Sequence, residues 1–194
     1  MALVGLKYHE RHKGFPNLRF LSLRRSFVDM NQTVNVLLYL CKNADQLEEI
    51  DLQGCRRFDF NDISCALGPI TNRTALRRLD LTECNGKYGL GDLFLCPNEK
   101  PKLEYLNLSG LKLKENDFYQ IILQIINENL HLKHLDLSKT SITAKQVLQI
   151  LTGHHAIDKL NLTGVGSIPR GWKRELERKE FSRLVKIIKH TEEL

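Results

Sequence analysis

The chain has 194 residues, 42% of them hydrophobic and 27% charged, and this length suits one continuous folded body without a second domain. Its formal net charge of +6 arises at the two ends, because residues 1–25 carry six basic and one acidic side chain and residues 170–194 carry eight basic and five acidic ones. A face that binds nucleic acid would carry this excess itself, so the distribution weighs against a nucleic-acid partner.

The first segment, residues 1–15, lacks the apolar core and the small-residue cleavage site of a signal peptide. No later apolar run reaches the roughly 18 residues that a bilayer span requires. We therefore expect a cytoplasmic or nuclear protein.

Residues 16–165 contain six copies of the phrase L-x-x-[LI]-x-L, the last with isoleucine in first place. The copies are LRFLSL at 18, LEEIDL at 47, LRRLDL at 76, LEYLNL at 103, LKHLDL at 132 and IDKLNL at 157. Successive copies start 29, 29, 27, 29 and 25 residues apart, and a period of about 20–29 residues indicates a repeat architecture. Apolar residues two apart share one face of a strand, so each copy predicts a short strand with one buried face.

A helical pattern follows four of these strands, with apolar residues spaced so that they share one side of a helix. The stripes are Val34, Leu37, Leu38 and Cys41; Ile63, Ala66, Leu67 and Ile70; Phe118, Ile121, Ile122, Ile125 and Ile126; and Val147, Ile150 and Leu151. Each stripe begins 15 or 16 residues after the start of its phrase. We therefore expect one strand and one helix per repeat, and a capping box of Thr143 and Gln146 before the last of these helices.

Two segments depart from the regular pattern. Residues 83–101 hold three glycines and two prolines, which predicts a short helix or loop, with residues 85–92 extending the binding surface. Residues 166–194 predict a linker and then a basic amphipathic helix with an apolar stripe of Phe181, Leu184, Val185 and Ile188. This helix either caps the last repeat or binds an acidic membrane or a partner groove. Residues 1–15 are either a partial cap or part of a longer repeat array.

The stretch LCKNADQLEEIDLQGCRRFDFNDI resembles the cysteine-containing leucine-rich repeats of F-box/LRR proteins. Cys41 ends a helix, Cys55 opens the turn after the strand phrase, and Cys84 repeats the position of Cys55. Leu111, Thr140 and Val165 replace the cysteine later, so those repeats are also similar to the ribonuclease-inhibitor type. The resemblance implies an α/β solenoid, an arc with six parallel strands on the concave side and helices on the convex side.

The concave face holds the candidate partner-binding residues, because they point away from the buried leucines. They are Phe20, Arg24, Glu49, Asp51, Arg78, Asp80, Tyr105, Asn107, His134, Asp136 and Lys159. Tyrosine and arginine are the residue types that binding hot spots favour. The row through Asp51, Asp80, Asn107, Asp136 and Asn161 is either a carboxylate ladder for a cationic ligand or a consequence of the repeat phrase itself.

Catalytic signals are absent from the sequence. It contains no C-x-x-C pair, no complete set of zinc ligands and no phosphate-binding glycine loop, so we expect no enzyme activity, no metal and no cofactor. The odd number of cysteines favours buried thiols over a disulfide framework.

We expect another protein as the partner. The resemblance suggests substrate recognition or an adaptor role in a ubiquitin ligase; the alternatives are an enzyme regulator or inhibitor, a structural or sensor solenoid, and a host-directed effector.

Overall fold

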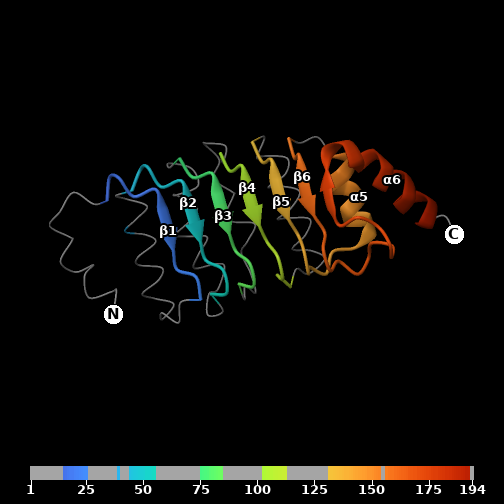
Figure 1. Ribbon diagram of the computed structural model, residues 1–194, viewed down its shortest axis with the longest axis horizontal. Coiled ribbons are helices and arrows are strands. Elements are labelled where there is room, and N and C mark those ends of the chain that lie inside the picture. The colour runs from blue at the N-terminus through green and yellow to red at the C-terminus, as the bar shows by residue number, and fades with distance from the viewer. Residues whose placement is uncertain are drawn as a thin grey trace.

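A computed structural model describes seven separate parts of the chain: residues 15–25, 39, 44–55, 75–84, 102–112, 131–153 and 156–192. Its described elements form an α/β fold with one seven-stranded sheet whose spatial order follows the sequence order, β1 to β7. The strands are β1 (Phe20–Ser22), β2 (Glu49–Asp51), β3 (Arg78–Asp80), β4 (Tyr105–Asn107), β5 (His134–Asp136), β6 (Lys159–Asn161) and β7 (Glu175–Glu177). Figure 1 shows these strands side by side along the long axis of the molecule.

Strands β1 to β6 are parallel, and each occupies the middle of one sequence phrase. Their register is constant: the central residue of every strand pairs with the central residue of the next, as Leu79 does with Leu106. Backbone bonding continues past each three-residue strand, since Leu81 N–H donates to Asn107 O at 2.9 Å and Glu83 N–H donates to Ser109 O at 2.8 Å. The pairing thus runs from the strand into the turn that follows it.

The leucines of the phrases form the core on one side of this sheet. Leu79, Leu81, Leu106 and Leu108 are fully buried, and equivalent residues from the other strands join the same cluster. Alternation along the strand sends the intervening side chains to the opposite face, which we call the open face. Burial of the leucine face therefore fixes which residues the open face can present.

Two helices of the described residues lie at the C-terminal end of the sheet (Figure 1). Helix α5 (Ala144–Thr152) begins with the predicted capping box: Thr143 Oγ1 accepts from the N–H of Gln146, and Gln146 Oε1 accepts from the N–H of Thr143. Its predicted stripe is buried, with Val147 and Ile150 fully enclosed.

Helix α6 (Arg178–Glu192) packs beside α5 and buries Phe181, Leu184 and Ile188 in the common core. Its apolar side therefore contacts this protein's own core. Within the described residues, no helix combines the length and the apolar character that a bilayer crossing requires.

The sheet has one strand more than the six parallel strands that the sequence predicts, because β7 pairs antiparallel with β6. The chain folds back after β6, and Arg174 fastens the returning loop by donating to Val165 O at 2.8 Å and to Ile168 O at 3.1 Å. Residues 166–194 therefore contain a strand as well as the expected linker and helix.

Several predictions lie outside the described residues. They are the irregular segment 85–101, the N-terminal segment 1–14 and the three earlier helical stripes, which are Val34, Leu37, Leu38 and Cys41, then residues 63–70, and then residues 118–126. These stay predictions.

Candidate docking surface

A continuous row of side chains crosses the open face, one from the first position of each parallel strand. Its members are Phe20, Glu49, Arg78, Tyr105, His134 and Lys159. The parallel register places each beside the next. Because no turn or bulge interrupts the pairing, residues that are 25 to 29 positions apart in the sequence become neighbours.

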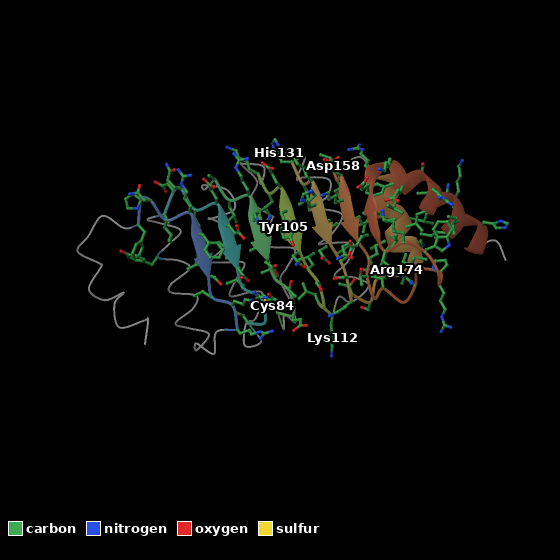
Figure 2. All side chains as sticks on the ribbon, viewed as in Figure 1. Cys84, Tyr105, Lys112, His131, Asp158 and Arg174 are labelled. Atoms are coloured by element: carbon green, nitrogen blue, oxygen red, sulfur yellow. The ribbon has the colours of Figure 1, made fainter. Side chains whose placement is uncertain are left out.

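Arg78 joins three strands of this row. Its Nε lies 3.3 Å from Glu49 Oε1, and its guanidinium carbon lies 4.1 Å from the centroid of the Tyr105 ring. The Tyr105 and His134 rings meet edge to face, with centroids 6.3 Å apart and planes at 86°. Cation–π and aromatic contacts of this kind are attractive and orient the groups that make them. Glu49, Arg78, Tyr105 and His134, which we call the central cluster, are therefore held in one arrangement near the middle of the sheet, where Figure 2 labels Tyr105.

The pKa values in the central cluster follow from partial burial and from its neighbours. Burial, followed by the negative charge of Asp80, raises the pKa of the Tyr105 hydroxyl. Burial, followed by the positive charge of Lys159, lowers the pKa of His134 below its usual value. Both directions favour the neutral phenol and the neutral imidazole, which lie beside the ion pair of Arg78 and Glu49 and give the cluster both apolar surface and hydrogen-bonding groups.

A second row on the open face holds acidic and amide side chains at the third strand position. These are Asp51, Asp80, Asn107, Asp136 and Asn161. In each of them Oδ1 accepts a hydrogen bond from the backbone N–H two residues later, at 2.8–3.0 Å. This bond closes a turn after every strand, so each side chain has a structural task.

The remaining oxygens of this row bond across strands. Asn107 Nδ2 donates to Asp80 Oδ2 at 3.2 Å, and Asn161 Nδ2 donates to Asp136 Oδ2 at 2.8 Å. These contacts favour the structural reading of the row over the reading as a ladder for a cationic ligand. Among the described residues, no group of three or more His, Cys, Asp or Glu is arranged to hold a metal ion.

Phe20 and Arg24 lie at the edge of the candidate surface. Phe20 is the one large hydrophobic side chain that is well exposed among the described residues, at 53%. Arg24 is exposed in the turn after β1. Strand β2 separates both of them from Arg78, so the structure groups the inner candidates more closely than these two.

The two described cysteines are buried and free of disulfide bonds. Cys84 Sγ donates to Leu52 O at 3.1 Å, and Cys55 Sγ donates to Leu23 O at 3.0 Å, so each thiol bonds to the preceding strand. Burial raises the pKa of Cys84 to about 12. A thiol with that pKa stays protonated at neutral pH, which makes Cys84 a poor nucleophile and a good packing group.

A third row, which the sequence reasoning missed, lies at the rim where β1 to β6 begin and the antiparallel β7 ends. It alternates in charge through the residue just outside each strand: Arg19, Glu48, Arg77, Glu104, Lys133, Asp158 and Arg178. Figure 2 labels Asp158 at this rim and Cys84 at the opposite end of the strands. The signal was available, because the second position of each phrase alternates between basic and acidic residues. Its significance depends on the strand register, which makes these positions neighbours.

Comparison with known proteins leaves the family open: no model of a protein family matches this chain, and no curated protein matches it.

Proposed function

We propose that this chain is a leucine-rich repeat solenoid that works as a protein-docking module and performs no catalysis itself. Six phrases with parallel strands in constant register, each with its leucines in one core, support the repeat architecture. The proposed repeats occupy residues 16–165, with residues 1–15 before them. The capping role of residues 166–194 is supported by Phe181, Leu184 and Ile188, which cover the end of that core.

The central cluster carries the docking proposal. In it Tyr105 contacts an arginine on one side and a histidine on the other, with Arg78 about half exposed and Tyr105 and His134 partly buried. Binding hot spots favour arginine and tyrosine in ordered surroundings, because little side-chain freedom is then lost when the partner binds. The acidic row is hydrogen-bonded within the protein and the rim row pairs cations with carboxylates, which leaves the central cluster as the most distinctive chemistry on the open face.

The open face is smaller than a standard interface. Seven strands at about 4.8 Å spacing make a sheet roughly 29 Å long, and about four exposed residues per strand make it roughly 13 Å wide. The product, roughly 380 Å², is less than half of the about 800 Å² that each partner buries in a standard complex. The partner therefore also contacts loops or the rims of the sheet.

A protein substrate presented to a ubiquitin ligase is the partner class that the resemblance favours, with catalysis by an associated ligase. Cys55 and Cys84 support this class, because both thiols fill the position that cysteine takes in F-box/LRR repeats. Leu111, Thr140 and Val165 fill the same buried position without a thiol, which favours an inhibitor-like array as the second candidate. Both candidates bind a protein through the open face.

The test is affinity capture with the tagged full chain, followed by mass spectrometry. We expect Arg78→Ala combined with Tyr105→Ala to lose the main captured protein, because the double variant removes both hot-spot residues. Lys145→Ala is the matched control, since it deletes an exposed charge on α5 away from the open face.

Enrichment of ligase subunits in the capture would favour the first candidate, and enrichment of one stoichiometric enzyme would favour the second. Full capture by the double variant, with an unchanged circular dichroism spectrum, would show that the open face is not the docking site.

A further inference from the structure

A pocket of about 460 Å³ lies between the loop that precedes β7 and the first turns of α6. Trp172, Leu176 and Leu184 supply its apolar wall. Leu176 and Leu184 are buried, at 4% and 1% exposed, and Trp172 is partly buried and packs against the core. The wall therefore belongs to the folded body, and the volume falls within the range of about 300–1,000 Å³ that ligand pockets show.

Charged side chains line the rest of the pocket: Arg170, Lys173 and Arg183 are basic, and Glu180 is acidic. Lys173 Nζ lies 2.9 Å from Glu180 Oε2, and the same oxygen accepts the backbone N–H of Glu177 at 2.9 Å. Glu180 is thus occupied with a lysine and with the start of α6. Three basic groups and one acidic group leave an excess of two positive charges.

Because Lys173 is paired with Glu180, the two arginines carry the excess positive charge. The Arg183 guanidinium carbon lies 5.4 Å from the Trp172 ring centroid, so the guanidinium stays beside the apolar wall. Neither Arg170 nor Arg183 forms an ion pair with a carboxylate of the described residues. Both side chains are exposed, and a guanidinium has the planar donor geometry that matches a carboxylate.

We propose that this pocket binds an acidic peptide segment of a partner protein, with one apolar side chain against Trp172 and a carboxylate on each side bonded to Arg170 and Arg183. The proposal concerns a second site, at the end of the sheet beyond β6, and does not depend on binding at the central cluster. The occupant is argued from charge complementarity and from the adjacent apolar wall.

A membrane surface and a nucleic acid fit this site less well than a peptide does. An amphipathic helix binds a bilayer through its apolar face, but Phe181, Leu184 and Ile188 of α6 are buried in the core. A polyanion requires a stripe of several cations, whereas the pocket offers two arginines without a carboxylate partner among the described residues. A short peptide needs contact with only two arginines and one ring.

Trp172 is the single tryptophan of the chain, so its fluorescence reports on the pocket directly. The full chain is titrated with a capped peptide of sequence Gly-Glu-Glu-Leu-Glu-Gly and, separately, with the same peptide carrying Gln in place of each Glu. We expect a saturable change in Trp172 emission with the acidic peptide. We expect affinity at least about tenfold weaker for the Gln peptide, since that fold-change corresponds to one charge-assisted hydrogen bond.

Two matched variants distinguish binding in the pocket from a general attraction to the positive charge of α6. Arg170→Gln with Arg183→Gln should weaken the acidic peptide by at least about tenfold. Lys189→Gln, an exposed change on α6 outside the pocket, should leave the affinity unchanged. The proposal is overturned if the acidic peptide gives no saturable signal or if both peptides bind equally. Tighter binding of a single-stranded oligonucleotide, or of vesicles with anionic headgroups, would also overturn it.

Discussion

Arg77 Nη1 lies 2.5 Å from Glu104 Oε1, and this contact joins the starts of two neighbouring strands. Lys133 Nζ, from the next strand along, lies 3.0 Å from the other carboxylate oxygen of Glu104. One carboxylate therefore bridges β3, β4 and β5 at the rim. The hydrogen bonds from Lys133 and then Arg77 hold the pKa of Glu104 below its usual value.

Glu104→Gln should destabilise the protein at neutral pH by about 0.5–1.5 kcal/mol, because it weakens two partly exposed ion pairs. A lowered folded-state pKa means that this stabilisation is complete above the unfolded pKa of about 4.3 and is lost as pH falls through the folded value. The difference between wild type and variant should therefore shrink in acid. Urea unfolding at pH 7 and at about pH 3 measures it. Glu175→Gln, which removes an exposed carboxylate of β7, is the control, and an equal effect of both changes would rule out the bridge as the cause.

Gly110 shows how closely consecutive turns stack. It has a φ of +72°, and a Cβ at this position would lie 3.1 Å from Glu83 Cγ in the preceding turn. Gly110→Ala should therefore cost about 1–2 kcal/mol from the left-handed backbone alone, with a further cost from the contact. Gly166→Ala should change stability by less than about 0.5 kcal/mol, since no atom lies within 4 Å of its Cβ position and its φ is not positive.

A double-mutant cycle separates the two costs at Gly110. In a Glu83→Ala background the Cγ atom is absent, so Gly110→Ala should retain the backbone cost and lose the contact cost. Free energies of unfolding from urea titration at pH 7 measure all four proteins. Equal effects of Gly110→Ala in both backgrounds would show that the turn relaxes away from the contact.

The strand positions could be predicted from the sequence because leucines that alternate along a strand all lie on one face, and that face must be the buried one. The capping box of α5 could be predicted from the spacing of Thr143 and Gln146, because both of its hydrogen bonds are local. Strand β7 could not be predicted. Its segment Glu175–Glu177 has one apolar residue between two charges, and its pairing depends on the loop that Arg174 fastens from nine residues away.

The sequence could predict which face of the sheet holds the candidate surface, but not which side chains on that face contact each other. The sequence placed Arg78 and Tyr105 on the same side of neighbouring strands, but their contact at 4.1 Å depends on the register and on the rotamers. The acidic row shows that the residue type alone does not decide the role of a side chain. Asp80 has the residue type of a ligand group, yet its two oxygens bond to the Thr82 N–H and to Asn107. Only the hydrogen bonds distinguish these two roles.

Cys84 should resist alkylation in the folded protein. Its thiol is buried, donates to Leu52 O and has a pKa of about 12, so little thiolate forms at pH 8. We expect iodoacetamide to label Cys84 only in urea, as measured by mass spectrometry of its proteolytic peptide. Labelling in buffer at the rate seen in urea would contradict a buried thiol.

Cys84→Val should cost about 1 kcal/mol. Valine keeps the apolar packing but removes the hydrogen bond to the preceding strand. The free energy of unfolding from urea titration at pH 7 measures this change. Val165 provides an internal reference, because it is buried at the equivalent position of the last repeat without a thiol. A stabilised Cys84→Val variant would show that packing outweighs the thiol bond.

His134 should titrate below its usual pKa of about 6.5, because burial and then Lys159 disfavour the imidazolium. A lowered folded-state pKa means that stability from the neutral imidazole is present above about pH 6.5 and is lost as pH falls through the folded value. Lys159→Ala should raise the pKa of His134 and still leave it below 6.5, because burial is the larger cause. An NMR titration of the imidazole Cε1–H signal measures the change. Lys145→Ala, on α5, should leave the signal unchanged; an equal shift in both variants would mean that net charge, not the neighbour on β6, sets the value.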